Sequence, residues 1–310
     1  MLRQFLTAIL AIIVTLLLAF TATAAEWTIM VYIGADNNLS SFINGDVDEM
    51  EEAGSTSEVN IVCQIDGKAS YGGYNDYLGN WSTVRRYYIQ AGNPTNNSID
   101  GGFISDLGDL NSANPDVLRD FAIWAINTYP AERYMLVLWN HGGGWARPAP
   151  PPSYKAIIWD DTNGDGSGIG FSNGEYANML SEIYDHLGKS ISIVGFDACI
   201  VGMLETEYET MGYADYLVHS EANVPGDGWD YDFLVSLTAD PYCSEEQVIN
   251  WLIDEYATYY SSSSVTMSGL RLDHDHNDYQ MAIADFGREL ILAGGKSNTS
   301  ITTSISAARD

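Results

Sequence analysis

The sequence predicts an α/β fold in which a mainly parallel sheet is covered by helices on both faces. Segments typical of strands alternate with helical patterns along most of the chain, the order that parallel sheets require. Two of the predicted strands, 134–139 and 191–196, are almost entirely apolar, which is typical of strands buried on both sides. The 310 residues, 46% of them hydrophobic, suffice for one large core or two modest ones.

The first half of the chain alternates clear strands with polar connections. Residues 66–80 are rich in Gly, Tyr and Asn and predict an exposed loop, and a second long polar loop ends near Asn111. Asn114 is suited to cap the helix that follows, with Pro115 in its first turn. The predicted strands are 26–33, 59–65, 82–90 and 134–139, and the predicted helices run from the turn after 33 to about 53 and over 115–129.

The second half begins with a proline-rich segment, 146–156, where regular structure is disfavoured and the chain should be accessible to a protease. Residues 297–310 complete no element and are interpreted as a C-terminal tail, with truncation of a longer chain left open. The predicted strands are 157–159, 191–196, 216–220 and about 265–272, and the predicted helices are 173–187, the stretch after Cys199 to about 212, 244–261 and 279–292.

The N-terminal residues 1–25 predict a signal peptide. Arg3 precedes an apolar run from about 5 to 20, and Ala22-Thr23-Ala24 offers a small-residue cleavage site. A retained membrane anchor is the alternative. We therefore expect one domain over 26–296 in a secreted or cell-envelope protein, without stable membrane association once the signal is removed.

The chain is strongly acidic, with 42 acidic and 13 basic residues and a formal net charge of -29. Such a charge repels nucleic acid and anionic membrane surfaces, so neither is expected as a partner. Cationic peptides would be attracted. The plain alternative is that the acidity only keeps an exported protein soluble.

Two chemically active side chains follow apolar strands. His141 comes after the strand 134–139, and Cys199 comes after the strand 191–196. Carboxyl ends of parallel strands meet at one edge of a sheet, so these side chains are expected to lie together, as a thiol protease requires. The chain has three cysteines; a disulfide between Cys63 and Cys243 would leave Cys199 free, but the sequence cannot establish that pairing.

Five motifs in order connect these observations to a known family. They are WTIMVYIGADNNL (27–39), NHGGGW (140–145), WDDT (159–162), FDAC (196–199) and PGDGWDY (225–231). With them the chain resembles the clostripain-like cysteine peptidases, relatives of caspases, legumains and gingipains, over about 26–292. The resemblance implies a caspase-like three-layer sandwich.

The resemblance also implies a catalytic dyad of His141 and Cys199. A free thiol has a pKa of about 8.5, so attack at neutral pH needs a partner that favours the thiolate. The backbone N–H groups of Gly142 and Cys199 would stabilise the oxyanion, since a glycine lets the backbone approach closely. Taken alone, His141 could be a polar histidine in a loop, and Cys199 could be a buried structural thiol.

Substrate recognition and activation are implied in the same way. Asp197 and Asp227 match the acids of the family's specificity pocket, which predicts a peptide or protein substrate with Arg, and then Lys, before the scissile bond. A turn residue is the alternative for Asp227. Self-cleavage is expected between Lys155 and Ala156, with Arg147 as the second choice.

No cofactor is required for thiol chemistry, but calcium is considered. Asp161, Asn163 and Asp165 have the opening spacing of a calcium loop, although Ser172 stands where an EF-hand has a bidentate Glu. Some clostripain-like enzymes depend on calcium, which favours a structural ion here. A solvated Asx-turn is the alternative.

Two other functions stay open. The HGGG run and the Gly-x-Ser-x-Gly match around Ser172 would suit a serine esterase, but the serine follows an Asp/Gly-rich loop and not a hydrophobic strand. A catalytically silent caspase-like module that binds calcium or proteins is the second alternative. The presence of both His141 and Cys199 argues against it.

Overall fold

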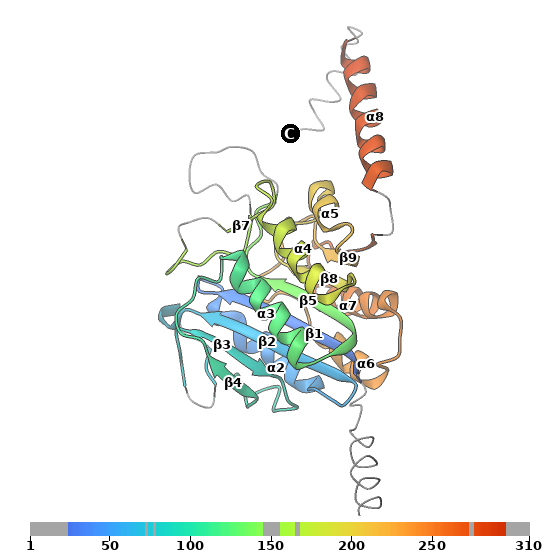
Figure 1. Cartoon of the computed structure of the whole chain (residues 1–310). Helices are drawn as coiled ribbons and strands as arrows, with labels where there is room; N and C mark the ends of the chain where they lie inside the picture. The colour runs from blue at the N-terminus through green and yellow to red at the C-terminus, as the bar shows by residue number, and fades with distance from the viewer. Residues whose placement is uncertain are drawn as a thin grey trace, which may run out of the picture.

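The computed structural model describes residues 24–71, 74–76, 79–144, 156–164, 168–272 and 276–295. Its centre is an eight-stranded sheet with the order β10-β9-β8-β5-β1-β2-β3-β4 (Figure 1). The five strands from β9 to β2 run parallel, while β3, β4 and β10 pair antiparallel at the edges. The predicted mainly parallel sheet is therefore confirmed.

The strands are β1 (Ala25–Ala35), β2 (Val59–Gly67), β3 (Val84–Tyr88), β4 (Phe103–Asp106), β5 (Ala131–Trp139), β8 (Ile191–Asp197), β9 (Ala214–His219) and β10 (Ser268–Arg271), with β6 (Ala156–Ile157) and β7 (Ile169–Gly170) in a separate two-stranded sheet. The helices are η1 (Ser40–Phe42), α2 (Ile43–Ala53), η2 (Ala69–Tyr71), α3 (Pro115–Thr128), α4 (Glu175–Leu187), α5 (Leu204–Thr210), α6 (Phe233–Ala239), α7 (Glu245–Tyr259) and α8 (His276–Gly295).

Helices cover both faces of the sheet and create two cores. On one face α2, α6 and α7 pack with Ile29, Val31 and Ile33 of β1, and on the other α3 and α4 pack with Met30 and Tyr32 of the same strand (Figure 1). Alternate side chains of β1 are thus buried on opposite faces of the sheet. Burial of a large apolar side chain stabilises the folded state by about 1.5–3 kcal/mol. This explains the unbroken apolar runs in the sequence.

Three elements differ from the sequence prediction. β4 lies inside the predicted polar loop, because an edge strand with one exposed face has little apolar signal. α6 was missed, because its short FLVSLTA sequence follows directly on a loop and shows no long periodic pattern. The helix expected just after Cys199 begins only at Leu204, since Ile200 adopts a positive φ of 53° that interrupts a helical path.

Helix capping agrees with the prediction at the start of α3, and a second cap stands at the start of α7. The side chain of Asn114 accepts a hydrogen bond from the N–H of Asp116 at the start of α3, with Pro115 in the first turn. Ser244 does the same for Gln247 at the start of α7. No helix in the described part of the chain is long and apolar enough to cross a membrane.

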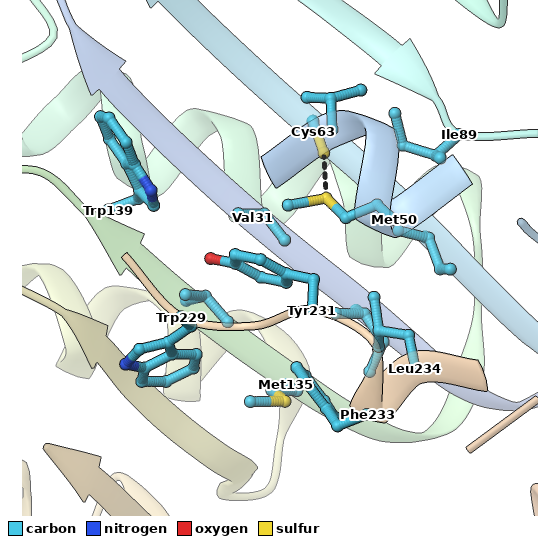
Figure 2. Close-up of a cluster of buried hydrophobic side chains, with 14 of the residues drawn as sticks. Val31, Met50, Cys63, Ile89, Met135, Trp139, Trp229, Tyr231, Phe233 and Leu234 are labelled. Carbon is cyan, nitrogen blue, oxygen red and sulfur yellow. Dashed lines mark hydrogen bonds between the residues drawn. The ribbon is translucent and has the colours of Figure 1, made fainter. Parts of the chain in front are cut away.

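All three cysteines are free. Cys63 is buried in β2, and its Sγ lies 3.5 Å from Met50 Sδ of α2. Figure 2 marks this contact with a dashed line. Cys243 lies between α6 and α7, where its carbonyl accepts a hydrogen bond from Arg133. The disulfide considered from the sequence is therefore not formed.

Candidate active site

The register of β5 and β8 brings His141 and Cys199 to one edge of the sheet. These strands are parallel neighbours, and Trp139 at the end of β5 pairs with Asp197 at the end of β8. His141 and Cys199 each follow two residues further along. Neighbouring parallel strands lie about 4.8 Å apart, so the two side chains begin from adjacent positions.

Both residues line one cavity of about 360 Å³ at this edge. The other walls come from the loop after β1, from the ends of β5 and β8, and from the loop after β9. They are formed by Leu39, Trp139, Asn140, Gly142, Asp197, Ala198, Asn223, Val224, Pro225, Gly226 and Gly228. The predicted thiol and imidazole therefore share a recess large enough for a substrate side chain.

The imidazole of His141 is half-buried and held by an amide. Its Nε2 lies 2.8 Å from Oδ1 of Asn38. When Nε2–H donates to that oxygen, Nδ1 is left as the basic nitrogen. Burial lowers the pKa of His141 below its ordinary value, while the charge of Asp161 acts in the opposite direction. A neutral imidazole at pH 7 is suited to accept a proton.

The thiol of Cys199 lies on a tight turn at the end of β8. Its Sγ is 3.5 Å from the carbonyl oxygen of Val224. The N–H of Ile200 donates to Ala222, and the N–H groups of Val201 and Gly202 donate to Ser220. This turn fixes the main chain beside the thiol, and the left-handed conformation of the β-branched Ile200 is a strain of about 1–3 kcal/mol.

Gly142 passes against the main chain of Cys199. A Cβ at position 142 would overlap the carbonyl oxygen of Cys199 and lie 3.0 Å from Val201 Cγ2, so only glycine fits. Gly142 forms a bridge with Ile157, whose two hydrogen bonds use the N–H groups of Gly143 and Ile158. The N–H of Gly142 is not used in that bridge.

Asp197 lies in the wall of the cavity but is deeply buried. Its Oδ2 accepts hydrogen bonds from the N–H of Trp229, at 3.0 Å, and from the hydroxyl of Tyr231, at 3.2 Å. Burial raises its pKa to about 7, and these two donors act against that rise. Figure 2 shows Trp229 and Tyr231 in a buried hydrophobic cluster that also contains the cavity residue Trp139.

Two further acids of α2 stand behind Asp197. Asp46 accepts a hydrogen bond from Nε1 of the cavity residue Trp139, and Glu49 accepts one from the N–H of Tyr231. Burial, followed by the charge of Asp197, raises the pKa of Asp46, and burial raises that of Glu49 to about 8. Asp227 is exposed and outside the cavity wall, yet its charge also raises the pKa of Asp46.

The remaining predicted residues are dispersed. Asp161 Oδ2 lies 3.7 Å from Lys68 Nζ, and the side chain of Asn163 donates to Asp109. Lys155, Arg147 and Asp165 lie outside the described residues, while Ala156 begins β6 and accepts from the N–H of Gly143. Ser172 is exposed in a turn after β7 and does not line the cavity.

Sequence reasoning missed Asn38 and Asp46. Asn38 belongs to the GADNNL motif, which the resemblance had quoted without giving this residue a role. Asp46 lies in a helix rich in acidic residues, and such a sequence is typical of a solvent-exposed helix. In the structure, however, Asp46, Asp48 and Glu51 are all buried. Only the packing of α2 against the sheet distinguishes these acids from surface charges.

A thiol, an imidazole and a glycine-lined backbone lie together at the carboxyl edge of a mainly parallel sheet, an arrangement that a cysteine peptidase requires. The sequence matches the clostripain family over residues 31–288. The chain therefore belongs to the clostripain family. It is 34% identical to clostripain from Hathewaya histolytica over 221 residues, which are 66% of this chain and 40% of that protein. It thus spans about two fifths of the length of that relative.

Two solved structures of cysteine proteases have a similar fold. A secreted C11 cysteine protease from Bacteroides thetaiotaomicron, in complex with an irreversible peptide inhibitor, has a TM-score of 0.64 and 22% identity, covering 87% of this chain and 71% of that one. An inactive zymogen C11 protease from Parabacteroides distasonis has a TM-score of 0.57 and 20% identity, covering 84% and 65%. The predicted caspase-like α/β fold is confirmed.

Proposed function

We propose that this chain is an exported cysteine endopeptidase that cleaves after Arg, and less readily after Lys. The single observation that supports this most strongly is that His141 and Cys199 line the same cavity from the ends of adjacent strands. Membership of the clostripain family supports the reaction type. The serine esterase alternative lacks this support, because Ser172 stands outside the cavity.

The proposed reaction begins with transfer of the Cys199 thiol proton to His141. The thiolate attacks the carbonyl carbon of the scissile peptide, and the N–H groups of Gly142 and Cys199 stabilise the resulting oxyanion. The imidazolium then protonates the leaving amine as the C–N bond breaks, leaving a thioester. Water, deprotonated by His141, hydrolyses the thioester and restores the free thiol. Asn38 would keep the imidazole oriented throughout.

Selectivity for a basic side chain would come from the acids around the cavity. Asp197 lies in its wall, Asp46 accepts a hydrogen bond from the wall residue Trp139, and Asp227 stands between the wall residues Gly226 and Gly228. An entering guanidinium would lower the pKa of Asp197 and favour its ionised form. A planar guanidinium can pair with a carboxylate through two hydrogen bonds, whereas an ammonium cannot, so Arg should be preferred to Lys.

Self-cleavage between Lys155 and Ala156 would activate the enzyme, with Arg147 as the second site. Ala156 supports this only indirectly, since it anchors β6 beside Gly143 at the edge of the active site. Wild-type protein should yield two fragments on incubation, and Cys199→Ala should remain one band. A single band for wild-type protein under conditions where it cleaves peptides would refute self-processing.

Fluorogenic peptides test the function as a whole. Matched substrates ending in Arg, Lys or Asp should be cleaved in the order Arg, Lys and then negligibly Asp. Cys199→Ala and His141→Ala should lower kcat/KM by at least about 10³-fold, because the nucleophile and the base act as a unit. Equal rates in wild-type protein and Cys199→Ala would exclude the thiol mechanism.

A further inference from the structure

A second group of buried acids lies at the same edge of the sheet, beside the active site. Asp36 follows β1, Asp66 lies near the end of the neighbouring β2, and Asp160 follows β6. One carboxylate oxygen from each lies within 4.8 Å of the others, and all three residues are buried. Among the described residues they are the one such group of possible metal ligands.

Two of these acids are fixed by neutral donors. Asp160 accepts hydrogen bonds from the N–H groups of Ser112, Thr162 and Asn163, at 2.7–3.0 Å. Asp36 accepts one from the hydroxyl of Thr162 at 2.8 Å. These donors hold the carboxylates in place without neutralising their charge. Oδ1 of Asp160 also accepts from the N–H of Gly164 at 3.3 Å, so it is Oδ2, which accepts from Ser112, that has room for a cation.

The third acid, Asp66, has an oxygen without a partner. Its side chain is only 2% exposed, and its Oδ2 has no hydrogen bond among the described residues. A buried polar atom left unpaired costs about 1–3 kcal/mol, and more when it is charged. The unpaired oxygen of Asp66 therefore points to a partner that the described protein residues do not provide.

The charge and spacing of the group suit a divalent ion. Lys68 is the nearby cation, with Nζ 3.3 Å from Asp36 Oδ1, but this ammonium is shared with Asp161, whose Oδ2 lies 3.7 Å away. Calcium binds oxygens at about 2.3–2.6 Å, so ligands on opposite sides of the ion stand about 5 Å apart. Magnesium keeps several waters, for which three buried carboxylates leave less room. We propose that Asp36, Asp66 and Asp160 bind a calcium ion.

This site is connected to the catalytic histidine through consecutive residues. Asn37, next to Asp36, donates hydrogen bonds to Oδ1 of Asn140 and to the carbonyl of Trp159. Asn38 follows and holds Nε2 of His141. An ion that fixes Asp36 would therefore also fix the segment that orients the imidazole. This second part of the proposal, but not calcium binding itself, rests on the proposed peptidase function.

The proposed site differs from the calcium loop expected from the sequence. That loop would use Asp161, Asn163 and Asp165, but the side chains of Asp161 and Asn163 contact Lys68 and Asp109 instead. Asp160 bonds to the main chain at the start of this loop. The two sites therefore make opposite predictions for substitutions at Asp66 and Asp161.

Calorimetric titration with calcium chloride tests the binding. The full chain carrying Cys199→Ala, which prevents self-digestion, is freed of metal with a chelator and titrated with calcium. Asp66→Asn in that background should bind at least about tenfold more weakly, because it loses a charged ligand of nearly the same shape. Asp161→Asn is the matched control and should bind within about threefold of the parent. Equal affinity in the parent and Asp66→Asn, or loss of binding only in Asp161→Asn, overturns the proposal.

Thermal unfolding provides a second measurement that does not depend on activity. In chelator, Asp66→Asn should be at least as stable as the parent, because one of three crowded carboxylates is gone. With calcium at about 1 mM the order should reverse, since only the parent binds the ion well. A variant that is less stable by the same amount in both solutions would show a purely structural role and overturn the proposal.

Peptide cleavage by the enzyme with its thiol intact tests the connection to His141. Wild-type kcat/KM should fall at least about tenfold in chelator and recover with calcium, while Asp66→Asn should respond to neither. Unchanged activity in chelator, together with proven calcium binding, overturns the connection. If calcium binds as described but no form cleaves any peptide, the calcium site stands and the proposed peptidase function fails.

Discussion

Replacing Gly142 by Ala is the sharpest single perturbation of the proposed oxyanion site. The new Cβ would overlap the carbonyl oxygen of Cys199 and lie 3.0 Å from Val201 Cγ2, so the main chain must separate by about 1 Å. The N–H of Gly142 would move away from the oxyanion by a similar amount. Loss of one oxyanion donor costs about 10²–10³ in kcat, or about 2.7–4 kcal/mol of transition-state stabilisation. We expect kcat/KM to fall by that factor.

The assay is steady-state hydrolysis of an Arg-ending fluorogenic peptide, with the melting temperature measured in parallel. Gly45→Ala is the matched control, because a Cβ at Gly45 meets nothing within 4 Å, and its activity should stay within about twofold. The rate of Cys199 alkylation by iodoacetamide should change much less than kcat/KM in Gly142→Ala, since alkylation needs no oxyanion site. A folded Gly142→Ala enzyme with kcat/KM within threefold of wild type would refute the assigned role.

Three other predictions concern the same region. Asp197→Asn should lower kcat/KM for an Arg substrate by about 30-fold or more and reduce the preference for Arg over its uncharged analogue citrulline; an unchanged preference would remove Asp197 from the specificity pocket. Asn38→Ala should lower kcat about tenfold with little change in KM and shift the acid limb of the pH profile, because His141 loses its orienting contact; a change in KM alone would contradict this. The pKa of Glu49 is raised by burial to about 8, so the folded state holds a proton that the unfolded state releases near pH 4.5. The corresponding stability is complete below about pH 4.5 and is lost as pH rises towards 8, so melting temperature should fall over that window and fall less in Glu49→Gln; parallel curves for both proteins would refute the assignment.

The sequence was sufficient to predict the central sheet and the meeting of His141 and Cys199 at one edge of it. Strands β5 and β8 are buried on both faces and therefore read as apolar runs, and His141 and Cys199 follow them directly. Parallel strand order then requires their ends to meet at one edge. The edge strand β4 was missed, because it alternates between half-buried and exposed residues over only four positions. β10 has the same pattern, but it lies within the strand predicted at about 265–272.

The surroundings of the dyad could not be predicted in the same way. Asn38 and Asp46 come from a loop and a helix distant in sequence, and their contacts with His141 and Trp139 exist only after folding. The three acids Asp36, Asp66 and Asp160 lie in separate segments, so no local spacing marks them as a group. The Asp161 loop, by contrast, has a local pattern in the sequence; in the structure Asp161 lies beside Lys68 and the side chain of Asn163 donates to Asp109.

Site-specific labelling tests the dyad most directly. An arginine-containing peptide with an electrophilic carbonyl group is incubated with the intact chain, and the modified residue is located by peptide mapping. We predict a single adduct on Cys199, formed at least about 10²-fold more slowly in His141→Ala. An adduct on Cys243, or an equal rate on Cys199 without the imidazole, would contradict a shared active site.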